Sequence, residues 1–280
     1  MSSRAARFPG RELLDELGSV VPGDHSRQRL AEDYIERRLG AARTPWRVLD
    51  LGCGDGGSVD RFRSVDPEVR WVGLDVPDSP EVRTRRRGDA EFQSFDGVTI
   101  PFPEASFDLV YCRQVLEHVR HPEPLLAEVR RVLAPGGCFA GSTSQLEPYH
   151  SLSIWNFTPA GFCTLIGSAG LEPVEVRPGI DGVALISVRL FGSSPPRWLQ
   201  RQFAKWWATR SPLNALIDLY ARVAALDPQA TNATKLVLCG AFTFLARRPR
   251  GETTLPASPL VTSAAPVLEH HQGLRPGEGA

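Results

Sequence analysis

The feature that most constrains the fold of this chain is a strand, loop and helix pattern that begins at Trp46 and repeats. Short runs with strand character lie at residues 46–51, 71–76, 91–95, 107–112, 138–142 and 171–176. Between two of these runs, Pro122 opens a helical segment that ends at the turn 134–137 and carries one apolar stripe of Leu125, Leu126, Val129, Val132 and Leu133. Strands joined by such crossovers pair in parallel, with helices on both faces of the sheet. The sequence therefore predicts an α/β fold.

The flanking segments divide the chain into five parts. Residues 1–44 are predicted to form an N-terminal helical lid with a helix at 26–39, and residues 45–192 form the core, with a helix opened by Thr158-Pro159 and a further strand at 183–191. Residues 193–234 are a helical insertion with segments at 197–209 and 213–226, closed by Asp227-Pro228. Residues 235–248 hold the final core strand, at 236–247, and residues 249–280, rich in proline, glycine, serine and threonine, are predicted to be disordered.

Composition excludes several classes of protein. Lysine plus arginine and aspartate plus glutamate number 32 each, so the whole molecule has no field that would recruit nucleic acid, and the arginine-rich run 83–87 is interpreted as a solvated face. The five cysteines form no CxxC pair, which argues against a disulfide framework and against a metal site. Residues 1–21 lack a signal-peptide hydrophobic stretch, and the longest apolar run, 236–246, is too short to span a bilayer. We expect a soluble protein in the cytoplasm.

A glycine-rich turn at residues 52–57, GCGDGG, follows the first strand and fits the spacing of dinucleotide-binding loops. Asp75, at the end of the next strand, lies where a carboxylate would accept hydrogen bonds from ribose hydroxyls. This pattern is common to all nucleoside cofactors. Asp50, two residues before the first glycine, distinguishes among them because its charge would repel a pyrophosphate, whereas a cofactor with a positive amino group and no phosphate tolerates it. The alternative interpretation is that Asp50 only caps the turn.

Four motifs in order carry a family resemblance: VLDLGCG at 48–54, DGVTIPFPEASFD at 96–108, VLEHV at 115–119 and RVLAPGG at 131–137. They resemble class I S-adenosylmethionine-dependent methyltransferases of the small-molecule, type 11-like branch, over roughly residues 45–180 and the final strand. The resemblance implies a Rossmann-like fold with a seven-stranded, mostly parallel sheet and an antiparallel last strand, here with a helical insertion. It also implies S-adenosylmethionine as the cofactor.

The residues that the resemblance assigns to the cofactor follow the motifs. The backbone of Gly52, Cys53 and Gly54 would approach the methionine part, beside Asp50, and Asp75 would bind the ribose. The adenine would contact Val76, Asp96 and Gly97, and the methionine end would contact Cys112 and Arg113. Pro77 and Pro80 interrupt the segment where the family has a regular helix, so we expect that helix to be short or irregular.

Three residues are candidates for a catalytic base. Methyl transfer from a sulfonium is an in-line displacement, so a base is needed only where the acceptor must lose a proton. His118 follows the fourth strand, and Tyr149 and His150 follow the fifth strand on a loop expected to overhang the acceptor. The alternatives are that His118 packs structurally and that the other two are solvated loop residues.

The insertion combines Trp198, Phe203, Trp206 and Trp207 with basic residues, and residues 197–210 contain no acid. This pattern fits a lid over the substrate cleft or a peripheral membrane contact through 197–210. We predict a methyltransferase for a small-molecule or glycan- or lipid-linked acceptor, with oxygen as the methylated atom and no nucleic-acid partner. The alternatives are a nucleotide-dependent oxidoreductase and a non-catalytic scaffold with a methyltransferase-like fold. The acceptor and the oligomeric state are left open.

Overall fold

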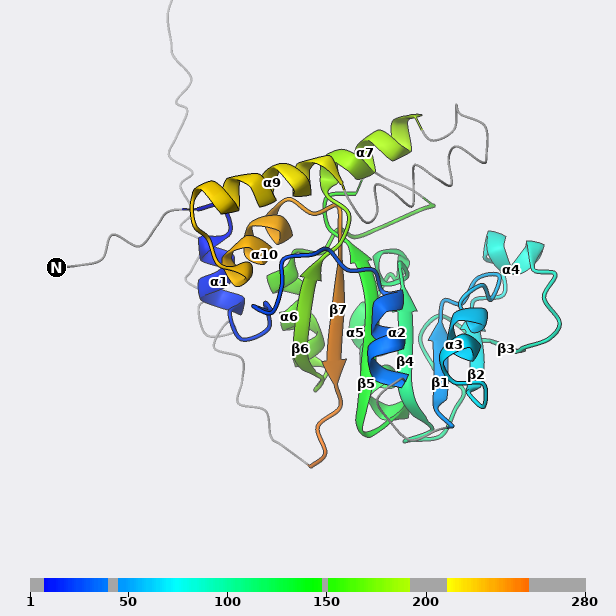
Figure 1. Ribbon diagram of the computed structural model, residues 1–280. Helices are drawn as coiled ribbons and strands as arrows, with labels where there is room; N and C mark the ends of the chain where they lie inside the picture. Colours follow the sequence, from blue (N-terminus) through cyan, green and yellow to red (C-terminus); the bar gives the residue numbers. More distant parts are fainter. Residues whose placement is uncertain (1–7, 40–44, 148–150, 192–210, 252–280) are drawn as a thin grey trace, which may run out of the picture.

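The computed structural model describes residues 8–39, 45–147, 151–191 and 211–251, and within them seven strands form one sheet (Figure 1). The strand order is β3-β2-β1-β4-β5-β7-β6, in which β7 runs antiparallel to both of its neighbours and the other pairs are parallel. The strands are β1 (Arg47–Leu51), β2 (Arg70–Asp75), β3 (Glu91–Ser94), β4 (Phe107–Arg113), β5 (Leu133–Ser144), β6 (Glu172–Pro178) and β7 (Ala241–Arg247). The predicted fold class is confirmed.

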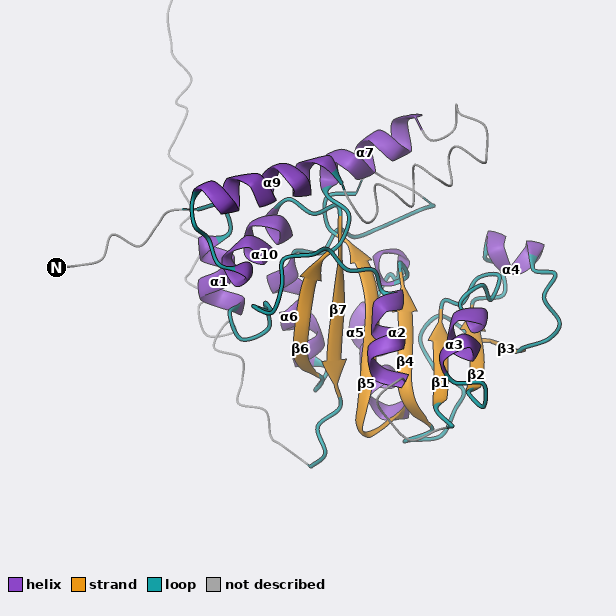
Figure 2. Ribbon diagram, in the orientation of Figure 1, coloured by secondary structure: helices purple, strands orange, loops and turns teal. Residues whose placement is uncertain are grey.

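Both faces of the sheet are covered by helices, because successive side chains of a buried strand point to opposite faces. Val48 of β1 packs with α2 (Glu32–Leu39) and α3 (Val59–Val65), whereas Leu49 and Leu51 face the opposite core. That opposite core is closed by α1 (Arg11–Leu17), α5 (Pro122–Val132), α6 (Pro159–Ser168) and α10 (Pro228–Val237) (Figure 2). The near-continuous apolar strands seen in the sequence follow from this double coverage.

Local signals set the boundaries of several elements as predicted. The first four strands begin and end within one residue of their predicted bounds. Thr158 caps α6 by accepting the Gly161 N–H at 3.0 Å, with Pro159 at the first helical position. The expected short helix before β3 is α4 (Pro80–Thr84), which has only five residues.

The prediction of a strand at 183–191 is wrong: this segment is the helix α7 (Gly182–Phe191). A short, continuously apolar run does not distinguish a strand from a buried helix by its periodicity. The buried Asp181 decides the outcome, because its carboxylate accepts the Ala184 N–H at 2.7 Å and thereby caps a helix.

The prediction of a strand from residue 236 is also wrong, and Asp227-Pro228, which closes the predicted segment 213–226, opens a further helix. The Asp227 carboxylate accepts the Ala230 N–H at 2.8 Å and opens α10, which continues through Val237, so β7 begins only at Ala241. The preceding helix α9 (Pro212–Val223) matches the predicted segment 213–226 closely. The sequence pattern therefore concealed one additional helix.

The N-terminal segment differs from the predicted helix at 26–39, since the helix begins only at Glu32. Residues before it are held in an extended path by side chains of α10 and β6. Asn232 donates to the carbonyl oxygens of Pro22 and His25 at 2.8 Å each, and Lys235 Nζ donates to that of Ser26 at 2.6 Å. These long-range bonds occupy carbonyl groups that a helix would use internally. Whether residues 1–44 open as a lid stays a prediction.

Helices α7 and α9 adjoin and lie across the end of the sheet at which β4 and β5 finish (Figure 1). The predicted helix 197–209 and most of the predicted tail, 252–280, lie outside the described residues. Within the described part of the chain, no helix is both long enough and apolar enough to cross a membrane.

Candidate functional site

Strand register brings the predicted site residues together at the carboxyl edge of the sheet. Leu51, the last residue of β1, pairs with Leu74 of β2 on one side and with Cys112 of β4 on the other. The residues that follow, Gly52, Asp75 and Arg113, therefore lie next to one another, because parallel strands end at one edge. Ligands of open α/β sheets bind in the crevice outside this edge.

The glycine turn has a backbone that only glycine adopts readily. Gly52 has φ +71° and Gly54 has φ +54°, both in the left-handed region. A Cβ at Gly52 would lie 2.2 Å from Cγ2 of Val115, so the close approach of the η1 segment, Leu116–His118, also requires glycine here. The turn is thus specified by both conformation and packing.

The N–H groups of the turn are used within the protein. Gly52 and Cys53 both donate to the carbonyl oxygen of Leu74, at 2.8 and 3.2 Å, and Gly54 donates to the Asp75 carboxylate at 2.7 Å. The Gly56 N–H donates to Cys53 and the Gly57 N–H to Asp55. A phosphate-binding loop instead points such N–H groups at its ligand. The turn therefore fits a cofactor without a pyrophosphate better than a dinucleotide.

Asp75 is held rigidly at the end of β2. One carboxylate oxygen accepts the Gly54 N–H and the other accepts the Val76 N–H at 2.8 Å. Burial raises the pKa of Asp75, against the opposing effect of these two backbone donors. Each oxygen retains a second lone pair, which is the arrangement that a ribose diol requires.

Asp50 points into the protein interior. It is 4% exposed and accepts a short hydrogen bond from Ser58 Oγ, while burial raises its pKa to about 7. The contact with Ser58 ties the end of β1 to the residue that precedes α3. Both interpretations of Asp50 remain open, since a turn-stabilising role does not exclude a role beside the cofactor.

The predicted adenine contacts come from two loops that meet. A Cβ at Gly97, which has φ +88°, would lie 3.6 Å from Cγ1 of Val76, so these two residues are neighbours. The exposed Asp96 accepts the N–H groups of Val98 and Thr99 at 2.8 and 2.6 Å, which lowers its pKa. The carboxylate of Asp96 is thus fixed in the loop whose Gly97 approaches the exposed Val76.

Arg113 and Cys112 have different surroundings. Arg113 forms a short ion pair with Glu32 of α2, whereas Cys112 is fully buried within the core. Sequence reasoning missed Arg85, whose guanidinium donates to the Gly54 carbonyl oxygen at 2.9 Å through Nε and stacks 3.9 Å from the Phe92 ring centroid. The arginine run thus includes a side chain that fastens the glycine turn, and only the fold reveals it.

A buried polar cluster lies at the carboxyl end of β5, beside η1. Glu117 is fully buried and accepts hydrogen bonds from Thr143 Oγ1 at 3.1 Å and Ser144 Oγ at 3.0 Å. Burial raises the pKa of Glu117 to about 7. Ser144 Oγ also lies 2.5 Å from a carboxylate oxygen of Glu147, whose other oxygen pairs with Arg189 of α7. Two carboxylates therefore share one serine, an arrangement with no local sequence signal because its members come from three elements.

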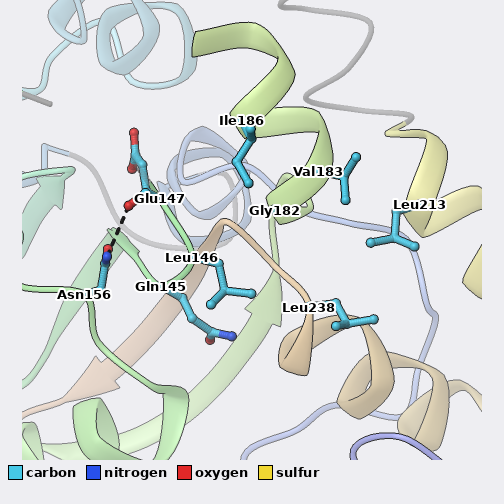
Figure 3. Close-up of a pocket in the computed structure, with 9 residues that line it drawn as sticks. All are labelled: Gln145, Leu146, Glu147, Asn156, Gly182, Val183, Ile186, Leu213 and Leu238. Atoms are coloured by element: carbon cyan, nitrogen blue, oxygen red, sulfur yellow. Dashed lines mark hydrogen bonds between the residues drawn. The ribbon is translucent and has the colours of Figure 1, made fainter. Parts of the chain in front are cut away.

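A pocket of about 460 Å³ lies beside this cluster (Figure 3). Glu147 and Asn156 line one side, and the rest is lined mostly by apolar residues of α7, α9 and the adjacent turns: Gln145, Leu146, Gly182, Val183, Ile186, Leu213 and Leu238. Asn156 Nδ2 donates to the Glu147 carbonyl oxygen at 3.1 Å. The pocket thus combines apolar walls with one carboxylate, as small-molecule sites often do.

The candidate bases are placed unevenly. His118 is half-buried at the end of η1, directly after Glu117. Tyr149 and His150 lie outside the described residues. A catalytic role for each of these three residues stays a prediction.

Comparison with known proteins fits this site. The family described as "Methyltransferase domain" matches residues 49–141. A trans-aconitate 2-methyltransferase of Methylobacterium nodulans is 38% identical over 129 residues, which cover 45% of this chain and 49% of the relative. A probable S-adenosylmethionine-dependent methyltransferase of Mycolicibacterium smegmatis is 31% identical over 172 residues, 56% of this chain and 65% of the relative. The chain carries a class I S-adenosylmethionine-dependent methyltransferase domain.

This methyltransferase domain also has solved structural neighbours. The [4+2]-cyclase SpnF has a TM-score of 0.52 and 18% sequence identity, over 85% of this chain and 92% of that one, which is a likeness of fold alone. S-adenosylmethionine is the cofactor of the domain, and the glycine turn, Asp75 and the Val76 and Gly97 pair fit it. The chain spans about half the length of the curated relatives it matches. The family match ends at residue 141, before Glu147 and α7.

Proposed function

We propose that the chain transfers a methyl group from S-adenosylmethionine to a hydroxyl oxygen of a small, largely apolar acceptor. The observation that carries the proposal is the internal use of every N–H that Gly52, Cys53 and Gly54 offer, beside a carboxylate with free lone pairs. Such a site suits a nucleoside that carries an amino acid and no phosphate. When bound, the cofactor supplies an electrophilic methyl group on a sulfonium.

The residues of the chain have separate tasks in this proposal. Asp75 accepts the ribose hydroxyls, and the pair of Val76 and Gly97 with Asp96 holds the adenine. The backbone of residues 52–54, with Asp50, Cys112 and Arg113 nearby, surrounds the methionine part. Burial raises the pKa of the Cys53 thiol to about 12, so Cys53 contributes through its backbone.

Oxygen is proposed as the methylated atom because one acidic residue, Glu147, lies among the mostly apolar residues that line the pocket. Glu147 lines the pocket and would accept a hydrogen bond from an acceptor hydroxyl, orienting one oxygen lone pair for in-line attack. As the new carbon–oxygen bond forms and the carbon–sulfur bond breaks, the hydroxyl proton leaves to a base. We propose His118 as that base, with Tyr149 and His150 as rivals on the following loop.

The pocket lining favours an apolar acceptor that carries a hydroxyl, alone or linked to a lipid or glycan. Leu146, Val183 and Ile186 offer apolar surface, and the Glu147 carboxylate is paired with Arg189. The cytoplasmic location of the chain and the absence of a nucleic-acid partner stay predictions.

The cofactor half of the proposal is tested by calorimetric titration with S-adenosylmethionine, S-adenosylhomocysteine and NAD. A ligand stabilises only the protein that binds it, so thermal shifts provide a second readout. Binding of the two sulfur compounds without NAD supports the methyltransferase. Binding of NAD alone would establish the oxidoreductase alternative, and binding of none would favour the scaffold.

The acceptor half is tested with a labelled methyl donor and a panel of apolar alcohols, amines and carboxylic acids. Label in alcohols alone supports oxygen transfer, and label only in amines contradicts it. For a positive acceptor, Glu147→Gln is expected to lower turnover while leaving the affinity for S-adenosylhomocysteine unchanged. Glu104→Gln is the matched control, because Glu104 is also paired with an arginine, Arg248 at 2.6 Å, but lies outside the pocket. Equal turnover of both variants would show that Glu147 does not contact the acceptor.

A further inference from the structure

Helix α9 is apolar on two opposite sides. Its inner side contributes the buried residues Ile217 and Ala221, together with Asn214. On the outer side, Leu216, Leu219, Tyr220 and Val223 follow the spacing i, i+3, i+4 and i+7, and all four are exposed, Val223 to 82%. A helix on the surface of a water-soluble domain normally turns polar residues outward. The outer side of α9 therefore needs a partner.

Helix α7 continues this surface. Val183, Ile186 and Leu190 lie at i, i+3 and i+7 and are exposed, whereas Ala184 and Leu185 face the protein. Helices α7 and α9 adjoin over the same edge of the sheet (Figure 2), so the two exposed stripes lie on neighbouring helices. We call these seven exposed residues the α7–α9 face. Several exposed apolar side chains on adjacent helices are typical of an interaction site.

Basic residues outnumber acidic ones in the stretch of sequence that runs from α7 to the end of α9. Residues 182–226 contain six basic residues and one acidic residue, in a protein whose total charges balance at 32 each. The single acid, Asp218, is already paired with the buried Lys235 at 2.7 Å. The sequence between the two helices also contains Trp198, Trp206 and Trp207. The sequence from α7 through α9 is therefore basic as well as apolar.

We propose that the α7–α9 face docks on the surface of an anionic lipid bilayer. Exposed leucine and valine side chains would enter the boundary of the acyl chains, while basic residues attract anionic headgroups. A second copy of the chain fits less well, because a two-fold interface would bring two basic regions into opposition. The docking is peripheral, through helices that lie along the membrane.

Docking would place the pocket at the membrane surface. Val183 and Ile186 belong to the α7–α9 face and also line the pocket, with Leu213 of α9 opposite them (Figure 3). An apolar or lipid-linked acceptor could then enter from the bilayer without crossing water. This consequence rests on the proposed methyl transfer, whereas the docking itself does not.

The test is co-sedimentation of the full chain, without cofactor, with phosphatidylcholine vesicles that contain or lack phosphatidylglycerol. The wild-type protein is expected to bind the anionic vesicles and to be released by salt, since exposed charges are screened. Leu219→Glu is expected to lower the bound fraction by about tenfold, because it replaces an apolar anchor with a charge. Ser64→Glu adds the same charge on the exposed end of α3, away from the face, and is expected to bind as the wild type does.

Three results would overturn the proposal. They are absence of wild-type binding to anionic vesicles, binding of Leu219→Glu equal to that of Ser64→Glu, and a wild-type dimer in light scattering that Leu219→Glu dissociates. The last result would assign the face to a second copy. Retained binding of S-adenosylhomocysteine by Leu219→Glu shows that the variant is folded, and Val223→Asn, at the most exposed position of the face, repeats the test if it is not.

Discussion

Asp75→Asn offers the sharpest test of the cofactor site, because both oxygens of Asp75 already accept backbone N–H groups. The Gly54 N–H lies 2.7 Å from one oxygen and the Val76 N–H lies 2.8 Å from the other. An asparagine has a single acceptor oxygen, so its NH₂ group must face one of these donors. Leaving one buried donor without an acceptor costs about 1–3 kcal/mol.

The same substitution weakens the proposed hold on the ribose. Hydrogen bonds to a charged acceptor contribute about 1.5–3 kcal/mol and those to a neutral one about 0.5–1.5 kcal/mol, so two hydroxyls lose roughly 2 kcal/mol together. The dissociation constant for S-adenosylhomocysteine should therefore rise by about 10- to 100-fold, counting distortion of the turn. Isothermal titration calorimetry measures this change, and urea unfolding measures the accompanying loss of stability.

Asp55→Asn is the matched control for this experiment. Asp55 lies in the same glycine-rich turn and is exposed, but it accepts only one backbone bond, from the Gly57 N–H at 2.9 Å, through a single oxygen. Asparagine can preserve that bond, so affinity should change by less than about threefold. If Asp75→Asn binds the ligand as tightly as Asp55→Asn does, Asp75 does not carry the ribose and the reasoning fails.

Three further predictions concern stability. Gly52→Ala should lower the unfolding free energy by about 2–4 kcal/mol, because Gly52 has a positive φ and its Cβ would clash with Val115. Gly167→Ala is the control: its Cβ meets open space, so the same urea titration should show a slight rise in the unfolding free energy. Burial raises the pKa of Glu117 from 4.5 to about 7, so ionisation is disfavoured in the folded state and the unfolding free energy should fall as pH rises between these values. Glu117→Gln should reduce that fall by on the order of 2 kcal/mol. An unchanged dependence of the unfolding free energy on pH would contradict this prediction. Lys235→Met should cost about 1–3 kcal/mol and speed amide exchange in the N-terminal segment before α2, and unchanged exchange would show that Lys235 does not fasten that segment.

Local patterns in the sequence identified the cofactor half of the molecule. The strands from β1 to β4 are short, apolar and bounded by turn residues, so each carries its own signal. The glycine turn is specified in the same way, because positive φ at Gly52 and Gly54 favours glycine. Asp75 follows from its place at the end of a strand in a parallel sheet, whereas Val76 and Gly97 were assigned only through the family resemblance.

Contacts between distant parts of the chain decided other features. The non-helical path before α2 exists because Asn232 and Lys235 of α10 bind its carbonyl groups. The buried polar cluster depends on Ser144 contacting Glu117, which lies 27 residues earlier in the chain. The helix Gly182–Phe191, by contrast, begins at a local cap from Asp181, a signal that the apolar run concealed. The sequence by itself determined the fold class and the cofactor turn, since both depend on neighbours along the chain. The pocket beside Glu147 and the α7–α9 face are products of the tertiary structure, since they depend on side chains that only folding brings together.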